Sequence, residues 1–370
     1  MIVIAPDSYK GTMSATEVCK IIRSEILKVN PRLEIKCFPI ADGGEGTVDA
    51  LLFNGGEKIP VSVCGPLFET ADSFYGILPD STAVIEMAAA SGLPMVGKRK
   101  NPMQTTTYGT GQLIKASLDR GCKKILLGLG GSATNDGGIG CAAALGVKFL
   151  DRNGKEVSLN GAGLSDITRI DLSGIDKRLA QTDIEVLCDV VSPLFGKTGA
   201  AYVFAVQKGA DFETVKLLDN GLKNLAEVTE ITIGKDNSSV EGAGAAGGLG
   251  FGLVSFLGAR LVKGAPAVLK AMGFEQAAKC ADLVITGEGC MDNQSLLGKA
   301  PAAVASLSGN TPVVAIVGMS KVTDMSGSNI RRIYVTDHGK RPFEQVLREC
   351  REDLAAAAHR VAEDFFNSAI

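Results

Sequence analysis

Short apolar runs alternate with helical stretches along the chain, and at least four of these runs end in a loop that combines glycine with a carboxylate. Alternation of this kind is typical of an α/β protein with parallel strands. In such a sheet, ligands bind at the carboxyl ends of the strands. The sequence therefore predicts an α/β fold whose ligand site is built from strand-end loops. The loop residues are Asp7 with Lys10, Asp42 with Glu45, Asp136, and Glu288 with Asp292.

The first helical stretch carries start and stop signals. Ser14 and Glu17 have the spacing of a capping box, in which both side chains accept hydrogen bonds from N–H groups at a helix start. Apolar residues recur at helical spacing from Val18 to Val29, and Pro31 marks the end. Similar patterns predict strands at 2–5, 34–39, 82–87, 124–129, 184–187, 283–286 and 312–317, and helices at 47–53, 139–145, 251–261 and 342–366.

Length and charge limit the class of protein. The 370 residues predict about two domains, at roughly 100–200 residues each. The 41 acidic and 38 basic side chains give a net charge of −3, whereas nucleic-acid-binding proteins carry a concentrated basic face. The uncharged stretch 242–259 holds seven glycines, and a membrane span needs about 20 strongly apolar residues. With no basic, apolar leader, we expect a cytoplasmic protein that binds neither nucleic acid nor membrane.

Cysteine and histidine exclude several chemistries. The nine cysteines form no Cys-x-x-Cys pair, so zinc-ribbon spacing is absent and reduced thiols are expected. The only histidines are His338 and His359. Two histidines are too few for a His-rich metal site, and they make a His-based catalytic triad improbable. We expect His338, which follows Thr336 and Asp337, to lie at the surface.

The strongest single signal is the segment 130–140, GGSATNDGGIG. Five glycines lie among Ser, Thr, Asn and Asp between a predicted strand and a predicted helix. Such a turn offers backbone N–H groups and hydroxyls, which are typical phosphate ligands. A simple turn with positive φ is the alternative, but it needs neither so many glycines nor the hydroxyls. The pattern favours contacts with nucleotide phosphates.

A second signal is the turn from Asp42 to Glu45, in which two carboxylates flank two glycines. Carboxylate oxygens suit Mg²⁺, and a carboxylate can also accept the proton of a substrate hydroxyl. A solvated acidic turn remains the alternative for this segment taken alone.

Two further glycine segments match known motifs incompletely. The segment from Gly287 to Lys299 lacks the first glycine of a Walker A loop. The segment Gly242–Gly247 matches G-x-G-x-x-G but follows a polar turn instead of a strand. A close-packed turn or another kind of phosphate cradle is therefore favoured over a nicotinamide site.

Long blocks of the sequence resemble the bacterial glycerate kinase family, type I. They are 4–11 (IAPDSYKG), 41–47 (ADGGEGT), 128–138 (GLGGSATNDGG) and 285–289 (ITGEG), with weaker blocks at 83–88, 107–111, 207–210 and 242–250. The resemblance runs in order over nearly the whole chain. One departure is Cys290, where the TGEG block of the family usually continues with arginine.

The resemblance implies ATP- and Mg²⁺-dependent phosphorylation of D-glycerate to 2-phosphoglycerate. It also implies a flavodoxin-like, doubly wound α/β domain and a mixed α/β domain inserted in it, with a ligand cleft between them. We place the discontinuous flavodoxin-like domain at 1–65 plus 285–370. The inserted domain, which carries the Gly-rich loops, is placed at 66–284.

Roles can be assigned on the same basis. The nucleotide phosphates are assigned to Gly130, Gly131, Ser132, Thr134 and Asn135. Mg²⁺ is assigned to Asp42, Glu45 and Asp136. The substrate is assigned to Asp7, Ser8, Glu288, Ser295 and Lys299. Lys10 would neutralise charge in the transition state, and the catalytic base would be Asp42, Asp189 or Asp292.

Alternatives stay open on the sequence. The phosphorylated group could be the 3-hydroxyl, or the acceptor another small hydroxy acid. A nicotinamide-dependent oxidoreductase and a non-catalytic metabolite sensor are the rival classes. A homo-oligomer also stays open.

Overall fold

The computed structural model describes residues 1–296, 298–337 and 341–368, so His338 lies outside the described residues. The chain divides into two compact units, and each is described here by itself. The first comprises Met1–Ala41, Asp49–Gly55 and Ala265–Ile370, and the second comprises Asp42–Val48 and Gly56–Gly264. The domain limits predicted at 65/66 and 284/285, and the predicted ligand cleft, stay predictions.

The first unit is built on a five-stranded parallel sheet with the order β13-β12-β11-β1-β2. Counted along this unit alone, the order is 2-1-3-4-5, which is the flavodoxin-like arrangement. The predicted α/β class is thereby confirmed. The strands are β1 (Ile2–Pro6), β2 (Ile35–Cys37), β11 (Leu283–Met291), β12 (Val313–Ser320) and β13 (Ile330–Val335).

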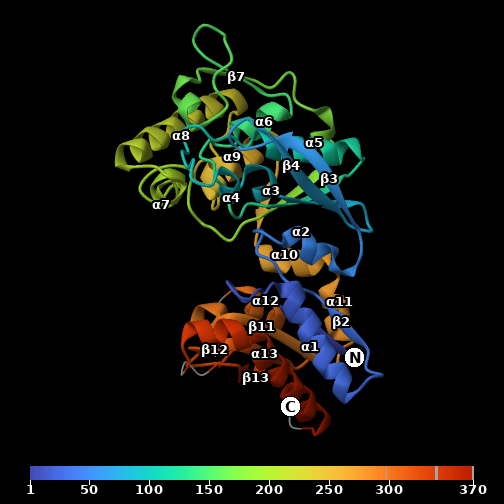
Figure 1. The fold of residues 1–370 in the computed structure, drawn as a ribbon. Coiled ribbons are helices and arrows are strands. Elements are labelled where there is room, and N and C mark those ends of the chain that lie inside the picture. The colour runs from blue at the N-terminus through green and yellow to red at the C-terminus, as the bar shows by residue number, and fades with distance from the viewer. Residues whose placement is uncertain (297, 338–340, 369–370) are drawn as a thin grey trace. The chain divides into compact units, whose positions relative to one another are not determined.

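Helices cover both faces of this sheet because successive strand residues point to opposite sides. Ile2 and Ile4 pack against α1 and α13, which lie side by side in Figure 1. Val3 and Ala5 pack against α10, α11 and α12 on the other face. The helices are α1 (Ala15–Val29), α2 (Thr47–Leu51), α10 (Gly264–Ala271), α11 (Phe274–Lys279), α12 (Ala300–Leu307) and α13 (Phe343–Phe366), and the 3₁₀ turns are Leu52–Asn54 and Asn293–Leu296. The first residues of α2 and α10 belong to the second unit.

Helix α1 begins and ends where its sequence signals predict. The Ser14 hydroxyl accepts a hydrogen bond from the Glu17 N–H at 3.2 Å. The helix stops at Val29, and Asn30 leaves the helical conformation just before Pro31. The buried side includes Val18, the first of the apolar positions that gave the pattern.

The second unit has a six-stranded mixed sheet with the order β10-β9-β6-β5-β4-β3. The first four strands are parallel, whereas β4 and β3 run antiparallel to their neighbours. This mixed sheet agrees with the predicted α/β class, and the insertion of one domain into the other stays a prediction. The strands are β3 (Glu57–Cys64), β4 (Thr70–Ile77), β5 (Thr82–Glu86), β6 (Lys124–Gly128), β9 (Asp183–Leu187) and β10 (Arg260–Val262), with β7 (Lys148–Leu150) and β8 (Arg169–Asp171) paired separately.

One continuous core joins this sheet to α5, α6, α7, α8 and α9. Figure 1 shows these helices in green to yellow. The helices are α3 (Ala88–Ser91), α4 (Leu93–Val96), α5 (Tyr108–Asp119), α6 (Ile139–Ala144), α7 (Ala200–Phe204), α8 (Phe212–Ile233) and α9 (Ala245–Leu257), and the 3₁₀ turns are Gly161–Asp166, Lys177–Gln181 and Val206–Lys208.

Of the predicted elements, two show the largest differences from the structure. Strand β11 does not end at Thr286, because the chain continues to pair with β12 as far as Met291. The helix predicted at 251–261 starts earlier, at Ala245, with left-handed residues at 246–248, and its predicted end forms β10 instead. In the described parts of the chain, no helix combines the length and the apolar character that crossing a membrane requires.

Candidate functional site

The predicted site residues fall into two groups, one in each compact unit. Both groups lie at or near the carboxyl ends of parallel strands, where ligands bind in open α/β sheets. The second unit holds Asp42, Glu45, Gly130, Gly131, Ser132, Thr134, Asn135, Asp136 and Asp189, and the first holds Asp7, Ser8, Lys10, Glu288, Asp292, Ser295 and Lys299.

The Asp42–Gly46 turn packs backbone to backbone against the ends of β6 and β9. Gly130 donates its N–H to the Gly43 carbonyl at 2.9 Å. A Cβ on Gly128 would lie 2.1 Å from that same carbonyl oxygen, and a Cβ on Gly43 would lie 2.9 Å from Leu187 Cβ. Side chains at Gly43 or Gly128 would push the two loops apart. The glycines therefore bring the acidic turn and the Gly-rich loop together.

Asp136 anchors the Gly-rich loop from inside. Its carboxylate is fully buried and accepts hydrogen bonds from the Thr107 N–H at 2.7 Å and hydroxyl at 2.8 Å. The N–H groups of Gly138 and Gly140 donate to it at 3.1 and 3.3 Å. Burial raises the pKa of Asp136, and these hydrogen bonds oppose the shift because they favour the charged form.

The Gly-rich loop is exposed only at its first turn. Gly131 is exposed and Gly130 is half-buried, whereas Ser132 is 8% exposed and both Thr134 and Asn135 are fully buried. A ligand can therefore reach Gly130, Gly131 and Ser132 in this conformation. Thr134 and Asn135 form the inner side of the loop.

The Asn135 amide is buried without a hydrogen-bond partner on either Oδ1 or Nδ2 among the described residues. Leaving such a group unpaired costs about 1–3 kcal/mol. Native proteins contain few such groups, and local costs of this kind concentrate at functional sites. The unpaired amide of Asn135 therefore supports a functional role for this loop, because stability alone would not favour it.

The Gly242–Gly248 segment packs directly behind that loop. The Gly247 carbonyl accepts a hydrogen bond from the Gly137 N–H at 3.0 Å. Gly247 has φ of +68°, and a Cβ there would lie 2.0 Å from the Thr134 carbonyl oxygen. The G-x-G-x-x-G match therefore belongs to a close-packed turn that supports the Gly-rich loop.

Lys208 is a component of this site that the sequence did not assign. Its side chain is buried, and its Nζ donates to Ser132 Oγ at 2.7 Å and to the Thr134 carbonyl at 2.6 Å. Burial lowers the pKa of Lys208 to about 7, and the nearby Asp136 charge opposes this shift. The only sequence signal was its place in the weak block 207–210.

This buried ammonium gives stability a predictable pH dependence. The pKa of Lys208 is about 7 in the folded chain against an ordinary 10.5, so the unfolded chain binds more protons between these values. We expect the unfolding free energy of the wild type, relative to Lys208→Met, to rise by about 1–2 kcal/mol from about pH 6 to about pH 8.5. Urea unfolding of both proteins across this range measures it. A flat or falling difference contradicts the expectation.

The backbone of Asp42 and the side chain of Asp189 both lie close to Gly264. The Asp189 Oδ1 accepts the Gly264 N–H at 3.0 Å, and a Cβ on Gly264 would lie 3.3 Å from Asp189 Oδ2 and 3.1 Å from the Asp42 carbonyl oxygen. Both aspartates are exposed, as is Glu45 on the same turn. The structure therefore brings two candidate bases and a second carboxylate of the acidic turn to one edge of the sheet.

In the first unit, the loop after β1 meets the end of β11. Asp7 donates its N–H to the Gly287 carbonyl at 2.8 Å and accepts the Ser8 N–H on Oδ1 at 2.6 Å. The buried Tyr9 hydroxyl donates to the Ile316 carbonyl at 2.7 Å, which fixes this loop to β12. Burial, with the Glu288 charge as a smaller cause, raises the pKa of Tyr9.

Glu288 and Asp292 have opposite electrostatic environments. Burial raises the pKa of Glu288, with the charges of Asp7 and Asp292 acting in the same direction. The pKa of Asp292 is held below its ordinary value, chiefly by the Ser295 N–H, which donates to Oδ1 at 2.9 Å. Lys299 Nζ lies 3.6 Å from that oxygen. Asp292 is thus the weaker base of the two.

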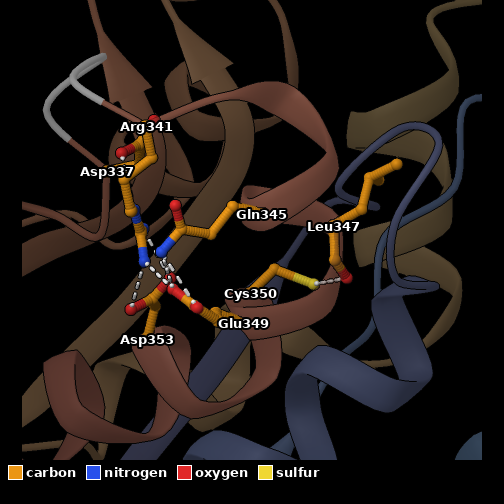
Figure 2. Close-up of polar contacts among 7 residues, drawn as sticks. All are labelled: Asp337, Arg341, Gln345, Leu347, Glu349, Cys350 and Asp353. Carbon is orange, nitrogen blue, oxygen red and sulfur yellow. Dashed lines mark hydrogen bonds and ion pairs between the residues drawn. The ribbon is translucent and has the colours of Figure 1, made fainter.

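A cluster around Arg341 ties the segment after β13 to α13 (Figure 2). The guanidinium contacts Asp337 at 3.2 Å, Glu349 at 2.8 Å and Asp353 at 2.6 Å. Asp337 is 7% exposed and donates its N–H to the Gly318 carbonyl. Three carboxylates around one guanidinium give the cluster a net negative charge. Arg341 therefore pairs with these carboxylates and has a structural role.

The acidic turn has donors of the kind that Mg²⁺ prefers. Within 1–296, 298–337 and 341–368, no three His, Cys, Asp or Glu side chains gather into a metal cluster. Mg²⁺ is commonly held by one or two carboxylates together with substrate phosphates, and the exposed Asp42 and Glu45 fit that pattern. Asp136 fits less well, because four internal donors already engage its carboxylate.

Comparisons with known proteins agree over the whole length. A family model described as the glycerate kinase family matches residues 2–365. A glycerate kinase of Bacillus subtilis (strain 168) is 47% identical over 368 residues, covering 98% of this chain and 96% of the relative. A glycerate 2-kinase of Escherichia coli (strain K12) is 45% identical over 322 residues, covering 86% and 84%.

A solved structure has the same fold. The crystal structure assigned to glycerate kinase 2 of Salmonella typhimurium LT2 superposes with a TM-score of 0.90 at 41% identity. The match covers 100% of this chain and 98% of that one.

Proposed function

Because the chain belongs to the glycerate kinase family, we propose that it transfers the γ-phosphoryl group of ATP to the 2-hydroxyl of D-glycerate. The products would be ADP and 2-phosphoglycerate. The observation that carries this proposal is the Gly-rich strand-end loop, whose exposed first turn is backed by the buried ammonium of Lys208. The name of the Escherichia coli relative, glycerate 2-kinase, supports the choice of hydroxyl.

Phosphoryl transfer depends on positioning and on neutralising charge more than on covalent chemistry. The Gly130 N–H is already donated to Gly43. We therefore assign the nucleotide phosphates to Gly131 and Ser132, with Thr134 and Asn135 shaping the loop. Glu45 would hold Mg²⁺, together with Asp42 if Asp189 is the base, and the bound ion would neutralise phosphate charge.

The catalytic base is proposed to be Asp42 or Asp189. Both carboxylates are exposed at the sheet edge, so a substrate hydroxyl can approach them. Asp292 is a poorer candidate, because Ser295 and Lys299 stabilise its charged form. A base must accept a proton, and that stabilisation opposes it.

The first unit would supply the groups for glycerate. D-glycerate is a small anion whose carboxylate needs a cation or N–H donors. Lys299 lies at the N-cap position of α12, and Lys10 is exposed in the loop after β1. We assign the substrate to Asp7, Ser8, Glu288, Ser295 and Lys299, and the developing charge to Lys10.

A coupled ADP-release assay with Mg²⁺, ATP and D-glycerate tests this function, with ³¹P NMR of the product. A 2-phosphoglycerate signal is expected. A 3-phosphoglycerate signal would keep the kinase and overturn the choice of hydroxyl. Folded protein that binds ATP but gives no turnover would point to another hydroxy acid. The cytoplasmic location and a homo-oligomer stay predictions.

The family relation also decides among the rival classes. The two relatives described above are named as kinases, and Gly242–Gly247 packs as a supporting turn, so no observation favours a nicotinamide-dependent oxidoreductase. Turnover in the assay above would exclude the metabolite sensor.

Cys290 gives a prediction for substrate affinity. It is exposed in β11, two residues beyond Glu288, where the resembled family usually has arginine. We expect Cys290→Arg to lower the KM for D-glycerate about fivefold, because one charge-assisted hydrogen bond contributes about 1 kcal/mol. Cys280→Arg, at another exposed cysteine, is the matched control. Steady-state kinetics with equal KM values in both variants would contradict it.

A further inference from the structure

The ammonium of Lys208 occupies an unusual environment. The side chain is 2% exposed, yet its two hydrogen-bond acceptors are neutral oxygens, the Ser132 hydroxyl and the Thr134 carbonyl. A buried charge without a hydrogen-bonded counter-ion is costly. A neutral donor such as glutamine can reach similar acceptors without that cost. An anion bound nearby would favour the charged form of Lys208, because an opposite charge stabilises an ammonium.

The bond to Ser132 fixes the direction of a proton. In its charged form Lys208 is a donor only, so Ser132 Oγ then accepts in its 2.7 Å bond with Nζ. The Ser132 hydroxyl hydrogen then points to a different acceptor. Ser132 is 8% exposed and follows the exposed Gly131, so an anion at that turn is within the reach of this hydrogen.

One carboxylate lies near enough to Lys208 to affect its charge. Asp136 is the carboxylate that interacts with Lys208 electrostatically. Its own oxygens are engaged by Thr107, Gly138 and Gly140, which disperse its charge. In a low-dielectric interior, a buried cation acts on a nearby anion more strongly than a solvated one does.

We propose that Lys208 is a positioning residue for the nucleotide, which makes the Ser132 hydroxyl a phosphate donor and holds a positive charge behind the exposed turn at Gly131. This inference rests on the proposed function, because it assumes that the loop binds the phosphates of ATP. It assigns no contact between Lys208 and the substrate. It predicts a selective effect on nucleotide affinity.

The experiment compares the wild type with Lys208→Met, Lys208→Arg and, as a surface control, Lys216→Met. Lys216 is a partly exposed lysine of α8 paired with Glu213. The measurements are kcat, the KM for ATP, the KM for D-glycerate, and calorimetric binding of ADP alone. Circular dichroism and thermal unfolding show that each variant is folded.

We expect Lys208→Met to raise the KM for ATP and the Kd for ADP about tenfold or more, with the KM for D-glycerate within about twofold of wild type. Lys208→Arg should recover most of the loss, because it keeps the charge. Should Lys208→Met not fold, Lys208→Gln, which keeps a donor without the charge, is measured against Lys208→Arg in the same way.

Two results would overturn the inference. One is ADP binding within about twofold of wild type in the neutral variants. The other is an equal rise in both KM values with a lowered Tm, which is the signature of a merely structural role. Wild type that binds ADP but does not phosphorylate D-glycerate would fail the proposed function, while the ADP titration still decides the role of Lys208. Wild type that binds neither ADP nor pyrophosphate would overturn both.

Discussion

A Gly247→Ala variant is expected to lose about 100-fold or more of kcat/KM, although residue 247 lies far from the Gly-rich loop in sequence. The added Cβ would lie 2.0 Å from the Thr134 carbonyl oxygen and 2.5 Å from Asn135 Cα. Both neighbours are backbone atoms, so the loop itself must move. Displacement of a phosphate-positioning group by about 1 Å is enough for a 100-fold loss.

Gly234→Ala separates this displacement from simple backbone strain. Gly234 ends α8 with φ of +72°, close to the +68° of Gly247, but a Cβ there would meet no atom within 4 Å. Both variants pay about 1 kcal/mol for a left-handed alanine. The control should keep near-normal kinetics, measured with the coupled assay alongside thermal unfolding. Equal activity in the two variants would show that the Gly-rich loop tolerates displacement.

Removing the catalytic base is the other large expected effect. Asn replaces Asp with nearly the same shape but cannot accept a proton at neutral pH. We expect one of Asp42→Asn and Asp189→Asn to lower kcat by about 10²- to 10⁴-fold, which is the usual contribution of general-base catalysis. The variant at the other aspartate should change mainly the KM values for the substrates. Single-turnover and steady-state kinetics of both variants measure the difference.

Asp72→Asn is the control for this pair. Asp72 is an exposed aspartate of β4, away from the strand-end loops. It should leave kcat within about twofold. If Asp42→Asn and Asp189→Asn are folded and both keep near-normal turnover, neither residue is the base, and Asp292 becomes the candidate to test.

Local signals predicted the parts of the fold that depend on neighbouring residues. The Ser14 cap and the end of α1 before Pro31 follow from short-range backbone chemistry. The strand-end loops were found because a buried strand must be apolar and its following turn must not be. The same regularity predicted that Asp42 and Asp136 follow the carboxyl ends of strands.

Long-range contacts escaped the sequence for a physical reason. Lys208 bonds to Ser132 across 76 residues, and Glu86, 3% exposed, accepts the Val48 N–H across 38. The sequence shows that a residue is a lysine or a glutamate, but it does not show whether the side chain is solvated or buried. The extension of β11 past Thr286 likewise depends on β12, its pairing partner. Residue spacing along the chain does not predict contacts between residues that are distant in sequence.

The order of strands in the first unit has a consequence for biosynthesis. β1 is flanked by β2 and β11, and Ala5 receives the Thr286 hydroxyl bond from 281 residues later in the chain. At about 5–20 residues per second, a ribosome leaves one edge of β1 without its neighbour for tens of seconds. The second unit, Asp42–Val48 and Gly56–Gly264, is complete before β11 emerges. Nascent chains stalled before residue 283 should therefore need chaperone protection of that N-terminal edge.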